Sequence, residues 1–262
     1  MTSKTEPRLL YYDLGEGVTA FSTTRHGGVS EANYASFNIN PYCGDSADHV
    51  ARNRQLLADR LGLPASHIVL PHQVHGIEHR AVAPELLDMS DAVRDKILDG
   101  VDMVTTSMTG VCIGVSTADC IPVLLYDPVA RATAAIHAGW RGTLQRICQR
   151  AVMAMQLHYG TTPDRLRAVV GPGISLANFE VGQEVYDQFV QTGFDLTETA
   201  EWHTKWHLDL PGINIRELIG CGVAPEHIHH AGICTFDHAD DYFSARRLGI
   251  DSGRIYTGIL MR

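Results

Sequence analysis

Residues 110–143 read GVCIGVSTADCIPVLLYDPVARATAAIHAGWRGT and decide how we expect the chain to fold. The Asp-Pro-Val-Ala segment at residues 127–130 has the aspartate and proline typical of a type I turn between two strands. If the two ends of this turn face each other, Cys120 lies directly opposite His137, with their Cβ atoms roughly 5 Å apart. We therefore expect a hairpin that brings a thiol and an imidazole together, unless a bulge shifts the register by one residue.

The segments on either side of this hairpin predict a mixture of helices and strands. Apolar residues recur three and four positions apart over 143–159, which predicts a helix that buries Cys148 and ends at Gly160. An earlier helix is expected to begin at Asp48 and end at Gly62. Further strands are predicted at 17–24, 166–170 and 228–235, and further helices near 182–191 and 213–221. The irregular alternation, with antiparallel strands at the centre, predicts an α+β fold with a mixed sheet.

The composition excludes several classes of protein. A chain of 262 residues with 45% hydrophobic residues can bury one large core, so we expect a single domain over residues 1–262. A formal net charge of −9 argues against a surface that binds nucleic acid. The start MTSKTEPR is polar, and no apolar run is long enough to cross a bilayer. The six cysteines show no CxxC spacing, which favours free thiols in a cytoplasmic protein.

A cysteine and a histidine on adjacent strands are compatible with two chemistries and with an ordinary buried pair. They could be a nucleophile and its base, because a thiolate beside an imidazole is activated. They could also bind a metal ion together with a third ligand from LPHQVHG at residues 70–76. We choose His75 as that ligand; His72 is three residues away and points to the opposite face of an extended chain. One thiolate and two imidazoles leave an open fourth position, as in catalytic zinc sites.

Three arginines are candidates for binding an anion such as phosphate. Arg25 lies in TTRHGG, where paired glycines can present backbone amides. Arg141 lies at the start of the helix that follows the hairpin, where free amide groups attract anions. Arg246 is the third candidate, and each of them could equally be a surface arginine. Asp119, next to the predicted cysteine ligand, is expected to orient a ligand or accept a proton.

Three other motifs are interpreted as unrelated to catalysis. HIHH at residues 227–230 has no acidic or cysteine partner at ligand spacing, and we interpret it as a solvated strand start. His203 and His207 have the spacing of a helical zinc pair but lack the glutamate of HExxH. The loop GPGIS at residues 171–175 lacks the spacing of a dinucleotide-binding loop.

Several segments together resemble the YfiH/LACC1 family over essentially the whole chain. The most specific are ADC at residues 118–120 and HAGWRGT at residues 137–143. The others, in chain order, are FSTTRHGGVS, SFNIN, NRQLLADRLG, HQVHG, GPGISLANFEVG, HLDL and YFSARRLGIDSGR. Members of this family are variously called laccase-type polyphenol oxidases, purine nucleoside phosphorylases or peptidoglycan editing factors. Tyr242 departs mildly from the family pattern, which has phenylalanine there.

The resemblance implies a metal centre of His75, Cys120 and His137, with zinc as the cofactor and copper as a second possibility. It also implies phosphorolysis of adenosine, inosine and methylthioadenosine, deamination of adenosine, and layered mixed β-sheets flanked by helices. The expected catalytic residues are His75, Cys120, His137 and Asp119, and the expected substrate contacts are Arg25, Arg141, Arg246, Gln73 and Asn38. We expect a nucleoside and phosphate as partners of a monomer or homodimer, and neither nucleic acid nor a membrane.

Two other functions are compatible with the same residues. A copper-dependent polyphenol oxidase could use a cysteine with two histidines, although a multicopper oxidase needs many more histidine ligands than this one site supplies. A metal-free cysteine hydrolase, or a factor that edits peptidoglycan precursors, would use Cys120 as a nucleophile. A non-catalytic, metal-stabilised binding module is a weaker alternative.

Overall fold

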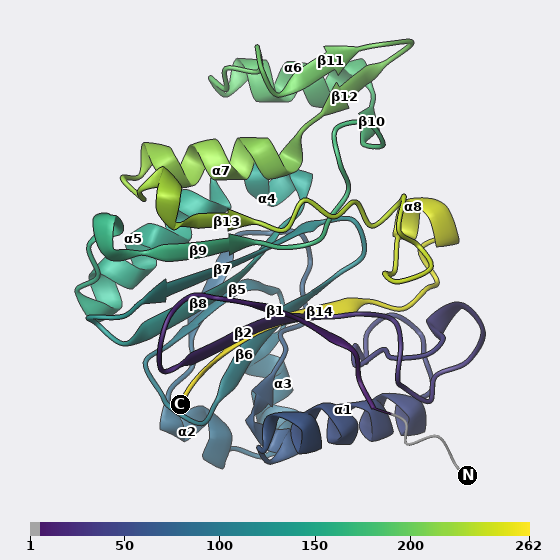
Figure 1. The fold of residues 1–262 in the computed structure, drawn as a ribbon, viewed down its shortest axis with the longest axis vertical. Coiled ribbons are helices and arrows are strands. Elements are labelled where there is room, and N and C mark those ends of the chain that lie inside the picture. Colours follow the sequence, from purple (N-terminus) through teal and green to yellow (C-terminus); the bar gives the residue numbers. More distant parts are fainter. Residues whose placement is uncertain (1–5) are drawn as a thin grey trace.

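The predicted hairpin forms the centre of a six-stranded mixed sheet in the computed structural model, which describes residues 6–262 (Figure 1). In sheet order its strands are β13 (Ile228–His230), β9 (Arg167–Val170), β7 (Ile121–Asp127), β8 (Ala132–Ala138), β5 (Val101–Thr106) and β4 (Glu78–Ala81). The two outermost pairs are parallel, and the inner pairs are antiparallel. Every residue of β7 and β8 is buried, because both faces of this sheet are covered.

Two further sheets complete the strand content of the described residues. A five-stranded sheet consists, in order, of β1 (Leu9–Tyr12), β2 (Val18–Thr23), β14 (Ile255–Met261), β6 (Cys112–Thr117) and β3 (Ile68–Val69). A small sheet consists of β10 (Glu180–Val181), β12 (Trp206–Leu208) and β11 (Ala200–Trp202), and it projects from one end of the molecule together with α6 (Gln183–Gln191) (Figure 1). The predicted strand at 17–24 is therefore confirmed as β2.

The layers of the fold follow from which side chains share a core. The two large sheets pack face to face, since Leu124 and Ala135 of one sheet belong to the same core cluster as Ile113 and Ile259 of the other. The outer face of the six-stranded sheet packs on α5 (Ile147–Tyr159) and α7 (Leu210–Gly220), and the outer face of the five-stranded sheet packs on α1 (Ala47–Leu61). The remaining helices are α2 (Pro84–Asp88), α3 (Asp91–Leu98), α4 (Trp140–Leu144) and α8 (Ala245–Leu248). The predicted fold class, α+β with layered mixed sheets flanked by helices, is confirmed.

The register of the central hairpin differs from the predicted one by two residues. Pro122, not Cys120, lies opposite His137, because Asp127 pairs with Ala132 and the turn is longer than expected. The Asp127 carboxylate accepts hydrogen bonds from two turn amides, and Arg131 adopts a left-handed φ of 48°. Because strand side chains alternate with a period of two, this shift leaves Cys120 and His137 on the same face, and they become diagonal neighbours.

Other predicted boundaries need correction. The single helix expected over 143–159 is two helices, α4 and α5, because Arg146 takes a left-handed φ of 61° between them. The expected stop at Gly160 is confirmed by its left-handed conformation, as is the stop of α1 at Gly62. Helix α1 begins after Ser46, so Asp48 lies within its first turn. The strand expected over 228–235 ends at His230.

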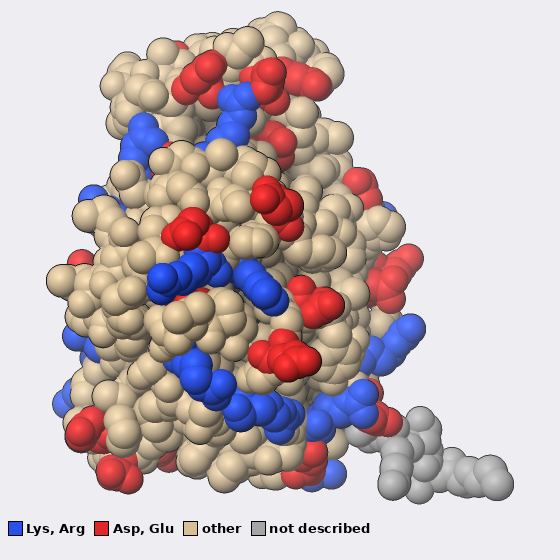
Figure 2. Space-filling model, turned by 60° about the vertical axis from the view of Figure 1, so that its left-hand side comes forward, with Lys and Arg blue, Asp and Glu red and all other residues tan. Residues whose placement is uncertain are grey.

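On the face drawn in Figure 2, acidic and basic side chains are interspersed, so this face is neither uniformly positive nor uniformly negative. Among residues 6–262, no helix combines the length and apolar character needed to span a membrane. Residues 1–5, which belong to the polar start of the chain, lie outside the described residues.

Candidate metal centre and its cavity

Three side chains from distant segments converge at one end of the central sheet. The ligand atoms of His75, Cys120 and His137 all lie within 4.8 Å of one another. His75 is exposed, Cys120 is half-buried and His137 is buried, and the two imidazole rings meet edge to face. The described residues contain no other group of three or more His, Cys, Asp or Glu side chains spaced to hold a metal ion. The structure therefore brings together the three residues that we expect to act as ligands.

Each of the three side chains is positioned by a different local feature. His137 lies in β8, and Cys120 directly precedes β7. Between β6 and β7 the chain turns at Asp119, which has a left-handed φ of 89°. His75 lies in the loop after β3 and also has a left-handed φ, 62°. Such conformations are uncommon for residues with a Cβ and cluster at functional sites.

A fully buried carboxylate, that of Asp102 on β5, contacts both the loop that carries His75 and the side chain of His137. Its Oδ1 atom lies 2.7 Å from Nδ1 of His137 and accepts a hydrogen bond from the amide of His75 at 3.0 Å. Its Oδ2 atom accepts hydrogen bonds from the amides of Val74 and Gly76. Burial disfavours the charged carboxylate, but hydrogen bonding and attraction to His137 outweigh burial and lower the pKa of Asp102.

The role of Asp102 follows from this geometry. A hydrogen bond from Nδ1 of His137 leaves the Nε2 atom of that imidazole available for a metal ion, an arrangement that is common behind histidine ligands. The sequence does not identify Asp102, because it follows Val101 in an apolar strand and has no spacing relation to the three ligands. Its only signal is a carboxylate within a run of residues that are otherwise suited to burial.

The thiol and the imidazole of the central hairpin also interact as charged groups. Burial raises the pKa of a thiol, but attraction to His137 and hydrogen bonds from both histidines dominate and lower the pKa of Cys120 to about 6. Burial lowers the pKa of an imidazole, but attraction to Cys120 and the hydrogen bond to Asp102 raise the pKa of His137 to about 9. Near neutral pH the cysteine is therefore a thiolate, which is both the metal-binding and the nucleophilic form.

The glycine that follows the hairpin keeps the space beside the three ligands open. A Cβ atom at Gly139 would lie 3.0 Å from Cδ2 of His75 and 3.2 Å from Sγ of Cys120. Any larger residue would therefore displace the cluster. This free space, the thiolate and the oriented imidazole fit a three-ligand zinc site, and the same donors are also acceptable to copper.

The cluster lies in the wall of a cavity of about 150 Å3 that opens to solvent. Apart from His75, Cys120 and His137, its walls include Asn40, Tyr42, Gln73, Ser116, Ile250 and Arg254. Among the described residues, no Asp or Glu lines this cavity. The lining therefore differs in charge from the rest of a chain whose net charge is −9.

Only one of the five expected substrate contacts, Gln73, lines the cavity. Its amide group donates to the carbonyl of Ser116 and accepts from the amide of the same residue, both at 2.8 Å. This two-point contact fixes the loop that carries His75 against the end of β6. The side chain of Gln73 is therefore already engaged with the protein backbone.

The three expected arginines are placed outside the lining. The guanidinium of Arg25 donates to the carbonyls of Ala35 and Ala239 and lies over the ring of Phe243. Arg141 is exposed and stacks on Trp140. The Arg246 guanidinium donates to the carbonyl oxygen of Glu180, outside the cavity wall.

The carboxylate of Asp119 forms its hydrogen bonds with residues other than His75, Cys120 and His137. It accepts hydrogen bonds from the hydroxyl of Thr235 and from the backbone amide of Arg246, each at 2.7 Å. Asp119 therefore connects the turn before Cys120 to the segment that enters α8, which is a positioning role.

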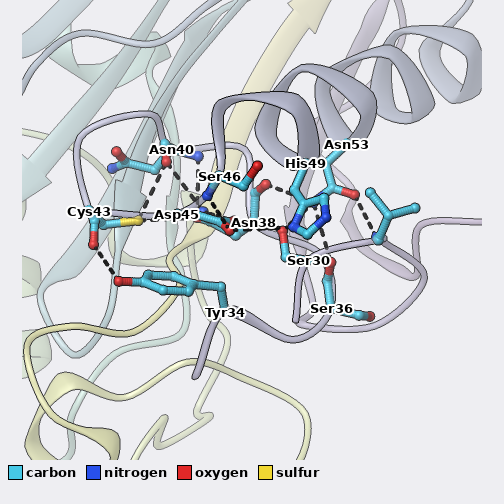
Figure 3. Close-up of polar contacts among 11 residues, drawn as sticks. Ser30, Tyr34, Ser36, Asn38, Asn40, Cys43, Asp45, Ser46, His49 and Asn53 are labelled. Atoms are coloured by element: carbon cyan, nitrogen blue, oxygen red, sulfur yellow. Dashed lines mark hydrogen bonds and ion pairs between the residues drawn. The ribbon is translucent and has the colours of Figure 1, made fainter. Parts of the chain in front are cut away.

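Asn38 lies behind the cavity wall in a buried polar network (Figure 3). Its amide nitrogen donates to the carboxylate of Asp45 at 2.9 Å, and its amide oxygen accepts from the backbone amide of Arg254 at 3.1 Å. The same oxygen accepts from the amide of Asn40. Asn38 thus holds together two loops that line the cavity, and the SFNIN segment places Asn40, two residues later, in the wall itself.

His72 lies in the cavity wall but not in the cluster. Its Nδ1 atom lies 2.6 Å from the carboxylate of Asp99, and its ring stacks on Tyr42 with centroids 4.2 Å apart. The sequence missed Tyr42, Ser116 and Arg254 as lining residues, since each lies outside the motifs that indicated the metal centre.

Comparison with known proteins places these features in a family. A family model described as "Multi-copper polyphenol oxidoreductase laccase" matches residues 19–262. A protein of Bacteroides thetaiotaomicron named purine nucleoside phosphorylase is 44% identical over 247 residues, which cover 93% of this chain and 92% of that protein. Adenosine deaminase RL5, from an unknown prokaryotic organism, is 40% identical and covers 93% of this chain and 94% of its own length. The crystal structure of YlmD from Geobacillus stearothermophilus superimposes with a TM-score of 0.88 at 30% identity, over 96% of this chain and 94% of that one.

Proposed function

This chain belongs to the multi-copper polyphenol oxidoreductase laccase family, and we propose that it is a zinc-dependent purine nucleoside phosphorylase that also deaminates adenosine. The proposed nucleosides for phosphorolysis are adenosine, inosine and methylthioadenosine. Relatives at 44% and 40% identity carry the names purine nucleoside phosphorylase and adenosine deaminase, and both are matched over more than nine-tenths of this chain.

The observation that carries this proposal is the convergence of His75, Cys120 and His137 at the wall of one cavity. These three side chains would hold the metal ion and leave its fourth position free. A bound zinc ion supplies Lewis acidity at that position. We assign His75, Cys120 and His137 as the metal ligands on this basis.

The protein groups around the ligands have separate tasks. Asp102 fixes the imidazole of His137 through Nδ1 and, through its amide contacts, the loop that carries His75. Gln73 holds the same loop against β6 through the backbone of Ser116. The cavity wall, free of carboxylates in the described part of the chain, does not repel an anionic co-substrate such as phosphate.

The direct test is incubation with adenosine in the presence and absence of phosphate, followed by separation of adenine, inosine and hypoxanthine. We expect inosine without phosphate, and free base only when phosphate is present. Both activities should be lost on chelation and restored by zinc. Absence of both activities in zinc-loaded protein would refute the proposal.

Copper-dependent oxidation of phenols is a second candidate, favoured by the description of the family model. A multicopper oxidase needs more histidine ligands than a single group of three side chains provides, and residues 6–262 contain one such group. Metal analysis of protein purified without added metal separates the two functions. Stoichiometric copper together with phenol turnover and no base release would favour the oxidase.

A third candidate is a metal-free hydrolase that uses Cys120 as its nucleophile, which the thiolate of Cys120 beside His137 favours. The substitution Cys120→Ala removes a metal ligand under the leading proposal and the nucleophile under this one. Cys221→Ala serves as the control, because Cys221 is a half-buried thiol outside the cavity. We expect Cys120→Ala to lose both the metal and nucleoside turnover, and Cys221→Ala to keep both. A Cys120→Ala protein that retains metal and activity would eliminate both roles.

A further inference from the structure

The cavity lined by His75, Cys120 and His137 has one permanently cationic side chain in its wall, Arg254. No carboxylate lines the cavity in the described part of the chain, although the protein has 30 acidic and 21 basic residues. Arg254 therefore faces the cavity without an acidic partner in its lining. Such a site favours an anionic ligand over a cationic or neutral one.

The guanidinium of Arg254 is held in place by the backbone around it. Nη1 donates to the carbonyls of Ser252 and Gly253, and Nη2 donates to the carbonyl of Ile250. The backbone amide of Arg254 donates to Asn38 of the buried polar network. Arg254 is thus positioned before any ligand arrives, which reduces the entropy that binding would cost.

Part of the guanidinium remains available for a ligand. Three of its five N–H groups donate to backbone carbonyls, and within residues 6–262 the Nε atom has no hydrogen-bond acceptor. An arginine that presents N–H groups in a fixed plane suits the oxygens of phosphate. The guanidinium groups of Arg25 and Arg246 are instead directed at carbonyls outside this lining.

We infer that Arg254 binds the inorganic phosphate used in phosphorolysis and the phosphate group of the sugar phosphate formed. This inference rests on the proposed function, because it assigns a residue to the phosphate of that reaction. Binding alone can also be tested, because the protein then binds inorganic phosphate in the cavity of His75, Cys120 and His137 through Arg254, whether or not a nucleoside is cleaved.

The test is a calorimetric titration of the zinc-loaded protein with inorganic phosphate, repeated on metal-depleted protein to separate binding at the metal from binding at arginine. We expect Arg254→Gln to weaken phosphate binding tenfold or more in both forms, and Arg254→Lys to weaken it less. Arg247→Gln is the matched control, because Arg247 also donates to a backbone carbonyl and lies outside the cavity. It removes the same charge and should change the affinity less than twofold.

Activity measurements refine the same test. In Arg254→Gln we expect the KM for phosphate in phosphorolysis to rise by a larger factor than the KM for adenosine in phosphate-independent deamination. An equal loss of both reactions would overturn the inference in favour of a purely structural role. Because Arg254 also fixes three carbonyls, its replacement could unfold the loop. A second measurement on wild-type protein avoids this difficulty: phosphate should protect Arg254 from modification by phenylglyoxal, as read by peptide mass spectrometry.

The possible outcomes distinguish the inference from the proposed function. The inference would be overturned if Arg254→Gln left phosphate binding unchanged, or if the wild-type protein bound no phosphate. It would also be overturned if phenylglyoxal modified Arg254 equally with and without phosphate. Arg254-dependent phosphate binding in a protein that cleaves no nucleoside would instead support the inference and overturn the proposed function.

Discussion

Two pairs of histidines in this molecule have nearly the same spacing but very different surroundings. The ring centroids of His75 and His137 lie 4.8 Å apart, and those of His203 and His207, on the small projecting sheet, lie 4.9 Å apart. His137 is buried against Asp102 and beside Cys120. His203 is exposed, and the carboxylate 3.4 Å from it, Glu201, is exposed as well.

Proximity of two imidazoles does not by itself supply the donor set that a metal site needs. The first pair gains a thiolate as third donor and a buried carboxylate that fixes one ring and the loop of the other. In the second pair, Nδ1 of His207 interacts with the carbonyl of Leu176, and the described residues contain no group of three donors spaced for a metal ion that includes this pair. Preorganisation by buried partners therefore separates the two regions.

The largest effect is expected from removing one proposed ligand of the first pair. His75→Ala should abolish stable metal binding, a greater loss than the roughly tenfold to hundredfold decrease typical of outer hydrogen-bond partners. His72→Ala, three residues earlier, should leave the metal bound, because His72 contacts Asp99 and Tyr42 instead of the cluster. Metal content after dialysis against a chelator of known affinity distinguishes the two variants. Equal metal loss in both would mean that His72 is a ligand.

The next largest effect should come from the buried carboxylate. Asp102→Asn keeps the shape but weakens the contacts to His137 and to the three amides of the loop, so metal affinity should fall about tenfold to hundredfold. Asp119→Asn is the control, since Asp119 is also buried next to the site but bonds to Thr235 and Arg246. It should lower stability without a comparable loss of metal, as measured by competition with a fluorescent chelator.

The sequence predicted that Cys120 and His137 lie close together, because a register error of two residues does not change which face of a strand a side chain occupies. The turn at 127–130 is longer than expected, yet Cys120 and His137 still share a face. Asp102 escaped prediction because its contact to His137 depends on the pairing of β5 with β8, which the local sequence does not specify. Arg254 ends the quoted segment YFSARRLGIDSGR, but its place in the cavity wall depends on long-range contacts, the pairing of β14 with β6 that begins at the next residue and the bond of its amide to Asn38.

A smaller but distinctive effect is expected in the pH titration of the metal-free protein. Cys120 should form a thiolate as the pH rises through about 6, since attraction to His137 outweighs burial and lowers its pKa from an ordinary 9.0. His137 keeps its proton until the pH rises through about 9. The ion pair therefore exists between about pH 6 and 9, and is lost below this window by thiolate protonation and above it by imidazolium deprotonation.

Thiolate absorbance near 240 nm measures this titration. Burial raises the pKa of the thiols of Cys43, Cys112, Cys148 and Cys221, so they do not contribute near neutral pH. Cys120→Ala should remove the rise at about pH 6. A wild-type protein whose absorbance rises only near pH 9 would show that the imidazole does not activate the thiol.

The smallest effect is expected in the second histidine pair, where the comparison can also fail. His203→Ala removes a contact to Glu201 between two side chains that are each more than half exposed, and even a fully charged pair of this kind contributes only about 0–1 kcal/mol. Metal content should therefore be unchanged, and the free energy of unfolding should change by no more than about 1 kcal/mol in thermal or urea denaturation. A second equivalent of zinc in wild-type protein that disappears in His203→Ala would show that an exposed pair can bind metal without a buried partner. That result would make spacing, and not burial, the deciding feature of both regions.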